Sequence, residues 1–381
     1  MPDLPVSTVV ATLGFLAGVV FGATSQRTNF CTMGAISDVV FMQDYRRFRM
    51  WLLAIAIAIA TSQALHLAGA IDLNKSIYLA PNFGWLGAIV GGLLFGFGMT
   101  LASGCGNRTL VRIGGGNLKS LVVAVVLGLF AFMTLRGLIG LARVTYIEPT
   151  NLGLGAAGLA AQGLPDMLAA LTGQSVTLAR VAIALAAVAG LVWYCLKDAA
   201  FRGSARLVGG AVVIGLLVPT GWAITGIVGH DEFDPTPLAS FTFVAPVGES
   251  LMYLMIFTGT TINFGIAAVG GVIVGSFVMA VATRTFHIEA FADPTDMIRH
   301  LAGGAIMGVG GVLSLGCTIG QGLTGLSTLA AGSALAFLSI LVGGVSALFA
   351  FGGYVMAAPD LAGIVSGEIA DPIPVILNAT L

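Results

Sequence analysis

The sequence predicts an all-α integral membrane protein with about nine transmembrane helices, short re-entrant half-helices and two inverted repeats. Charged residues make up only 9% of the 381 residues, against about 25% in soluble domains. Hydrophobic residues make up 57%, and the mean hydropathy is +1.01. A soluble enzyme of this length needs far more charged surface than these residues supply. The chain must therefore be surrounded by lipid. The net charge of −1 gives no basic surface, and no nucleic-acid partner is expected.

Nine stretches approach the length of about 20 mostly apolar residues that a transmembrane helix needs. They lie near residues 7–26, 48–68, 84–102, 119–141, 180–196, 207–228, 264–283, 300–316 and 333–356. Four other apolar segments are too short to cross, which is typical of half-helices that lie inside protein or against a cavity. These segments are 30–43, 106–118, 247–259 and 318–331.

Lysine and arginine orient the chain, because cytoplasmic loops carry an excess of these two residues. The predicted cytoplasmic clusters consist of Arg46, Arg47, Arg49, Lys197, Arg202, Arg206, Arg284 and Arg299. The loops at 70–83, 142–179 and 229–247 hold few cations and are predicted to lie outside. Nine crossings then place the N-terminus outside and the C-terminus inside.

A repeated segment relates the two halves of the chain. GGLLFGFGMTLASGC at 91–105 aligns without gaps with GGAIMGVGGVLSLGC at 303–317, with Cys105 on Cys317. In the predicted topology the two segments cross in opposite directions, so the halves are inverted, as in many transporters with a site at the repeat interface. The predicted units are a first repeat at 1–141, a linker loop and helix at 142–206, a second repeat at 207–356 and a C-terminal tail at 357–381.

The four cysteines are far apart in the sequence, so CxxC redox and zinc-ribbon patterns are absent, and neither a metal nor a cofactor is expected. Cys105 and Cys317 follow Gly104 and Gly316, at the points where apolar helices stop. Because both repeats place a cysteine at the same break, these two thiols are predicted to lie at a central site, with Cys31 nearer a mouth of the path. Cys195, alone in the linker helix, is interpreted as a buried filler.

Thiols at helix breaks suit the passage of an anion. An anion that enters lipid loses its hydration, and the N-termini of half-helices offer free N–H groups and a positive dipole end. Protonated thiols add weak donors without a fixed charge that would trap the ion. The candidate substrate ligands at the breaks are Gly104, Gly316, Asn107, Thr318 and Gln321. Arg108 is a further candidate, which would draw anions to one mouth. The predicted substrate is a soft, sulfur-bearing anion.

Four motifs resemble the YeeE/YedE (sulphur transport) family, over residues 14 to 345 or so. They are FGATSQRTNFCTMGAISD, LASGCGNRTLVRIGGGNLKSL, TFVAPVGESLMYL and GCTIGQGLTGLSTLAAGS. The resemblance implies a bacterial inner-membrane protein that takes up thiosulfate, with a periplasmic N-terminus and a cytoplasmic C-terminus in the predicted topology. It further implies a central line of three cysteines, matching Cys31, Cys105 and Cys317, and a small cytosolic sulfurtransferase-type carrier as partner.

Other functions stay open at the level of the sequence. The family includes members tied to selenium, so a selenium species is an alternative substrate. A membrane sulfurtransferase is a second alternative, with Cys31 or Cys317 forming a persulfide, although such a cysteine needs a nearby cation or base. A small-anion or gas channel with packing cysteines is a third. No ATP-binding motif and no buried acidic–lysine relay is recognised, so downhill transport without enzymatic activity is expected.

Overall fold

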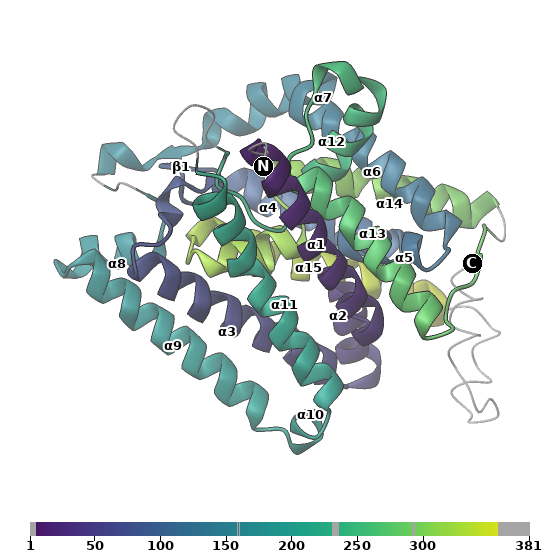
Figure 1. Cartoon of the computed structure of the whole chain (residues 1–381), viewed down its shortest axis with the longest axis horizontal. Coiled ribbons are helices and arrows are strands. Elements are labelled where there is room, and N and C mark those ends of the chain that lie inside the picture. The colour runs from purple at the N-terminus through teal and green to yellow at the C-terminus, as the bar shows by residue number, and fades with distance from the viewer. Residues whose placement is uncertain (1–4, 158, 160, 231–235, 292–293, 357–381) are drawn as a thin grey trace.

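The computed structural model describes residues 5–157, 159, 161–230, 236–291 and 294–356. These residues form a helical bundle (Figure 1) in which the strands are the antiparallel pair β1 (Asn82–Phe83) and β2 (Leu152–Gly153). The all-α prediction is therefore confirmed. The predicted tail at 357–381 and the acidic part of the 229–247 loop, residues 231–235, lie outside the described residues.

Long helices fall on all nine predicted spans. They are α1 (Val6–Thr28), α3 (Arg46–Leu67), α4 (Trp85–Leu101), α6 (Leu118–Arg136), α9 (Val176–Leu196), α11 (Ala205–Ala223), α13 (Phe264–Ala282), α14 (Pro294–Leu313) and α15 (Ala331–Met356). Within the described residues, eight helical stretches are long and apolar enough to cross a membrane. The ninth helix, α14, does not meet that criterion, although its 20 residues are long enough. Its first two turns carry Asp296, Arg299 and His300, and the prediction near 300–316 left Asp296 and Arg299 in the preceding loop, so α14 begins earlier than predicted and has a polar end.

The four segments predicted as too short to cross each hold a short helix. These are α2 (Thr32–Met42), α5 (Gly106–Gly114), α12 (Val244–Met255) and the π-helical η8 (Gly320–Gly325). The remaining elements connect the bundle and are α7 (Leu138–Ala142), α8 (Leu164–Thr172), α10 (Ala199–Arg202), η1 (Leu73–Lys75), η2 (Ile77–Leu79), η3 (Arg143–Ile147), η4 (Glu148–Thr150), η5 (Leu154–Ala157), η6 (Ile224–Val228) and η7 (Phe257–Gly259).

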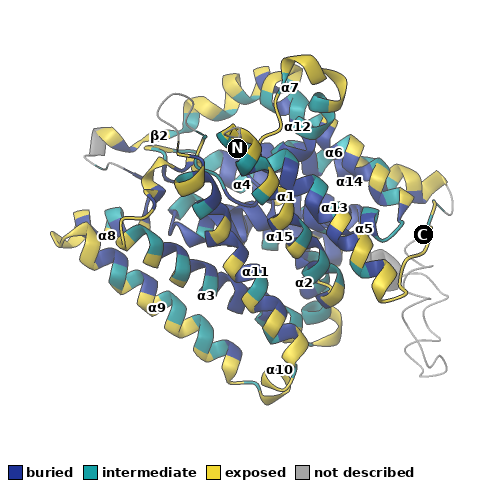
Figure 2. Cartoon of the chain, in the orientation of Figure 1, coloured by how far each residue is buried: buried dark blue, intermediate teal, exposed yellow. Residues whose placement is uncertain are grey.

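The helices pack in a few dominant pairs. α1 packs along α13, and α3 packs along α11. α4 lies between α14 and α15, and α14 also packs against α6. Buried residues concentrate around α4, α15 and the segments between them, whereas α9 lies at the rim against α3 with an exposed face (Figure 2). The core therefore sits where the long helices surround the short ones.

Glycines let α1 and α13 approach to backbone contact. A Cβ atom added at Gly275 would overlap the carbonyl oxygen of Val19, and one added at Gly22 would overlap that of Val272. Gly270 lies on α13 like Gly275, but a Cβ atom added there would lie 3.9 Å from the Phe15 ring, which is an ordinary contact. The small-residue packing face expected of membrane helices is thus present in this pair.

We expect Gly275→Ala to lower the free energy of unfolding by about 1–3 kcal/mol, because the two helix backbones must move apart. Gly270→Ala is the matched control, and alanine should be neutral or mildly stabilising there because it favours the helix. Thermal unfolding of the two purified variants in detergent measures the difference. Equal midpoints would contradict this account of the α1–α13 contact.

Candidate functional site: three cysteines at helix N-termini

Each of the three predicted path cysteines stands directly before a short helical segment. Cys31 is the N-cap of α2, Cys105 is the N-cap of α5, and Cys317 precedes a helical segment at 318–327. All three thiols are buried. The Sγ atom of Cys31 accepts the Gly34 N–H at 3.5 Å, and that of Cys317 accepts the Gly320 N–H at 3.4 Å. Sulfur is a weak acceptor, so these two N–H groups are only weakly hydrogen-bonded and are available to donate to a stronger acceptor.

The same backbone motif precedes each cysteine. Asn29, Ser103 and Leu315 lie two residues before the three cysteines and adopt left-handed conformations, with φ of 53°, 55° and 58°. The next residue in each case donates its N–H back across the last helical turn, from Phe30 to Ser25, from Gly104 to Met99 and from Gly316 to Gly311. This hydrogen bond is typical of the Schellman ending of a helix.

The backbone N–H groups of the two predicted ligand glycines are already hydrogen-bonded. The N–H groups of Gly104 and Gly316 close the ends of α4 and α14, with hydrogen bonds of 2.8 and 2.7 Å. These two N–H groups are occupied by carbonyl oxygens in the structure. The backbone donors that face the thiols of Cys31 and Cys317 instead belong to Gly34 and Gly320, three residues after each cysteine.

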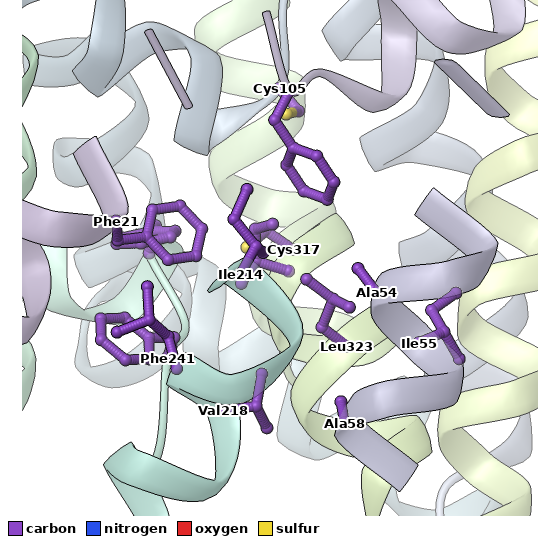
Figure 3. Packing of buried hydrophobic residues seen from close by; sticks show 14 of the residues in the cluster. Phe21, Ala54, Ile55, Ala58, Cys105, Ile214, Val218, Phe241, Cys317 and Leu323 are labelled. Atoms are coloured by element: carbon purple, nitrogen blue, oxygen red, sulfur yellow. The ribbon is translucent and has the colours of Figure 1, made fainter. Parts of the chain in front are cut away.

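The cysteines form a series in which only two are in contact. The thiols of Cys31 and Cys105 are close enough to interact, and Thr318 lies beside Cys105. Cys317 instead neighbours Thr242 and the backbone at the start of α12. Figure 3 shows Cys105 and Cys317 at separate levels among buried apolar side chains such as Ile214 and Leu323. The repeat aligns Cys105 with Cys317, but the direct thiol contact is between Cys105 and Cys31.

The predicted amide ligands are buried beside the thiols, but their N–H groups are in use. Asn107 donates from Nδ2 to the Phe30 carbonyl at 3.3 Å, and Gln321 donates from Nε2 to the Ser314 carbonyl. Their amide oxygens have no hydrogen-bond partner. Donation to an anion therefore requires the amide to turn over, which exchanges the positions of oxygen and nitrogen.

An arginine-lined vestibule lies at one end of the series. This cavity, of about 430 Å³, is lined by Thr28, Asn29, Asp44, Arg46, Arg47, Arg108, Ser204, Arg206 and Leu207. Arg108 donates to Asn29 Oδ1 at 3.3 Å, so the predicted mouth residue lies beside the segment that leads into Cys31. Arg47 pairs with Asp38 at 3.0 Å, and Arg46 pairs with Asp44 at 2.6 Å.

A smaller pocket, of about 20 Å³, lies at the other end. It is lined by Tyr78, Gly84, Ala88, Gln162, Leu313, Ser314, Leu315, Gln321, Gly332 and Ser333. Asp44 and Arg46 precede α3, whereas Tyr78 follows it. Leu207, at the start of α11, lines the vestibule, whereas the Tyr78 ring packs on Trp222, near the end of α11, so the two hollows lie toward opposite ends of this helix.

Sequence reasoning missed Tyr78 and Thr242. The two hydroxyls interact, and both lie near Cys317. Burial raises the pKa of Tyr78, so its hydroxyl remains a protonated donor. Tyr78 lies in a short connecting segment without periodicity, so no pattern could have selected it. Thr242 lies in the TFVAP motif, which resembled the family but suggested no role for this residue.

Two further groups bear on earlier expectations. Cys195 is buried and its Sγ contacts the Arg49 carbonyl at 3.3 Å, which places it between α9 and α3 and away from the other thiols. Sequence reasoning also missed an acidic–lysine ion pair, in which Lys119 is partly buried. Asp296 is buried, and its carboxylate lies 2.8 Å from Lys119 Nζ and 2.9 Å from His300 Nδ1, because α14 packs on α6.

These features define a multi-pass membrane protein in which broken helices enclose a buried polar series between two hollows. The profile of the family described as "Sulphur transport" matches residues 27–346. The chain belongs to this family, so the resemblance stated from the motifs is confirmed.

Two relatives match most of the chain. The thiosulfate transporter TsuA of Escherichia coli (strain K12) is 28% identical over 327 residues, which cover 81% of this chain and 86% of the relative. The thiosulfate transporter TsuA of Spirochaeta thermophila is 25% identical over 333 residues, which cover 87% and 96%. A probable transporter, YedE, of Salmonella typhimurium is 30% identical over 102 residues, covering 26% of this chain and 23% of the relative.

Proposed function

We propose that this protein takes up thiosulfate through a path lined by the protonated thiols of Cys31, Cys105 and Cys317. The observation that carries the proposal is the position of these three cysteines. Each stands at the N-terminus of a short helix, and the series lies between the Tyr78 pocket and the arginine-lined vestibule. The names of the two relatives that match most of the chain support thiosulfate as the substrate.

The physical argument concerns a dehydrated anion. Three helix N-termini present N–H groups and positive dipole ends, which return part of the lost hydration energy. The thiols suit the soft terminal sulfur of thiosulfate as well as its oxygens, because S–H is a weak and permissive donor. Weak donors in series let the anion move on, and the arginines of the vestibule attract it toward the far end.

Uptake into proteoliposomes tests this function. Labelled thiosulfate should enter, and excess unlabelled thiosulfate should block the signal, whereas excess sulfate should compete weakly because it lacks the soft sulfur. Equal competition by sulfate would contradict a thiol-selective path. Uptake of a selenium species in preference to thiosulfate would indicate the alternative substrate.

We further propose that the halves at 1–141 and 207–356 are inverted repeats joined by the 142–206 linker. The packing pairs support this. If α4 and α6 correspond to α14 and α15, the α4–α15 contact exchanges with the α14–α6 contact. If α1 and α3 correspond to α11 and α13, the α1–α13 contact likewise exchanges with the α11–α3 contact.

The proposed setting is the bacterial inner membrane, with a periplasmic N-terminus and a cytoplasmic C-terminus. In that orientation the arginine-lined vestibule opens to the cytosol, because Arg46 and Arg206 belong to the predicted cytoplasmic clusters. A small cytosolic sulfurtransferase-type carrier, which would receive the sulfur, would meet the chain on this face. We propose no enzymatic step for the transport itself.

Transport is expected to run downhill without ion coupling. Labelled thiosulfate should exchange with internal unlabelled thiosulfate when ionophores have removed every proton and sodium gradient. The Lys119–Asp296–His300 cluster gives this prediction its sharpest control, because the buried Asp296 and His300 and the partly buried Lys119 are titratable groups between two packed helices. A strict requirement for a proton gradient that disappears in Asp296→Asn would contradict downhill transport and assign the coupling to this cluster.

A further inference from the structure

Cys31 and Cys105 form a pair of adjacent thiols on two different short helices. Both residues are N-caps, and their thiols are close enough to interact. The hydrogen bond from Asn107 Nδ2 to the Phe30 carbonyl, at 3.3 Å, ties the first turn of α5 to the residue before Cys31. This bond from the Asn107 side chain to the Phe30 backbone holds the start of α5 next to the start of α2.

The surroundings of Cys31 favour a reactive thiol. Its Sγ accepts the Gly34 N–H at 3.5 Å, at the positive end of α2. The guanidinium of Arg47 lies against Gly34 and donates to the Asn29 carbonyl at 2.9 Å. Arg108 binds the side chain of the same Asn29 at 3.3 Å. Cations and a helix N-terminus stabilise the thiolate that forms when the protonated Cys31 gives up its proton to attack a sulfur electrophile.

The positive charge near Cys31 favours an oxidant that is an anion. Arg46, Arg47, Arg108 and Arg206 line the vestibule of about 430 Å³ that leads to Asn29 and so to Cys31. A doubly charged polythionate carries both the charge that arginine binds and a disulfide bond that a thiolate can attack. Tetrathionate, the oxidised dimer of thiosulfate, is the simplest member of this class.

We propose that Cys31 and Cys105 are an oxidisable dithiol, that polythionates convert it into a disulfide, and that this disulfide closes the path. The closure rests on the proposed transport function, whereas the disulfide itself does not. Oxidation removes both S–H donors and bonds the N-terminus of α2 to that of α5. The two short helices then cannot move apart to let an anion pass.

The chemistry balances without a further reactant. The Cys31 thiol loses its proton, and its sulfur attacks the central S–S bond of tetrathionate, releasing one thiosulfate and leaving a thiosulfonate group on Cys31. The Cys105 thiol then loses its proton and attacks Cys31 Sγ, releasing the second thiosulfate. Two thiols lose two electrons and two protons, and tetrathionate gains the two electrons. A dithiol reductant reverses the reaction.

Peptide mapping tests the disulfide directly. The purified full chain is treated with sodium tetrathionate, alkylated in denaturant and digested without reduction. The four cysteines are free before treatment. We expect loss of two alkylatable thiols and a peptide pair that links Cys31 to Cys105. The link should persist in Cys317→Ser and Cys195→Ser and disappear in Cys31→Ser. Four free thiols after treatment, a stable thiosulfonate on Cys31, or a link to Cys317 would each overturn the dithiol.

Uptake measurements test the closure. Proteoliposomes that contain wild type or Cys195→Ser should lose at least about nine-tenths of their thiosulfate uptake after tetrathionate treatment and recover it after reduction. Full uptake by protein that peptide mapping shows to be linked would overturn the closure. If untreated wild type imports no thiosulfate, the transport function fails, and the mapping experiment still decides whether the dithiol exists.

Discussion

Replacing Cys105 or Cys317 with alanine is expected to reduce thiosulfate uptake at least about tenfold. Each substitution removes an S–H donor to a charged substrate at a buried point of the path, where the charge of the substrate is then less well compensated. A tenfold loss corresponds to about 1.4 kcal/mol in the transport barrier. Initial rates of labelled uptake into proteoliposomes, corrected for the amount of reconstituted protein, measure the effect.

Alanine variants of the other two cysteines are the comparisons in the same experiment. Cys195→Ala should retain nearly full uptake, because Cys195 lies between α9 and α3. Cys31→Ala should have an intermediate effect, because the arginines of the vestibule partly replace its donor at that end of the path. Full uptake by Cys317→Ala would contradict the thiol-lined path and favour a small-anion channel in which the cysteines only fill space.

Asn107→Asp is expected to abolish most uptake by placing a negative charge beside the Cys31–Cys105 pair. Asn107 is fully buried, and its side-chain oxygen has no hydrogen-bond partner. A carboxylate of the same shape would repel a divalent anion at close range, where the protein screens charges far less than water does. The expected loss is at least about tenfold, or 1.4 kcal/mol, and the same uptake assay measures it.

Asn107→Ser is the control for lost structure. Serine also removes the hydrogen bond from Asn107 to the Phe30 carbonyl, but it adds no charge. The aspartate variant should therefore be clearly less active than the serine variant at equal folded protein. Equal rates would show that position 107 acts only through packing, and would remove it from the path.

Hydropathy was enough to predict the bundle. The apolar stretches correspond to the long helices because a membrane leaves backbone groups no partner outside a helix. The Gly–Cys steps at 104–105 and 316–317 also marked two real breaks. The helix α14 departs from this simple picture because its polar N-terminal turns are paired with Lys119 across the bundle, and a hydropathy average does not register such a partner.

The detailed geometry of the site could not be predicted from the sequence. The left-handed residues that end the helices are Asn29, Ser103 and Leu315, and only asparagine among them is common in that conformation. The repeat suggested that Cys105 and Cys317 form the central pair, whereas chain packing brings Cys105 against Cys31. Contacts between residues far apart in the sequence decide this, and a single sequence does not carry them.

The central claim is that intact thiosulfate crosses the membrane along protonated thiols. The most direct test is uptake of thiosulfate labelled separately on its sulfane and sulfonate sulfur atoms, into proteoliposomes that contain wild type or Cys317→Ser. The account predicts that wild type imports both labels equally, that the variant imports little of either, and that neither label stays on the protein. Sulfane label bound covalently to the chain, with sulfite released outside, would contradict the account and indicate a membrane sulfurtransferase.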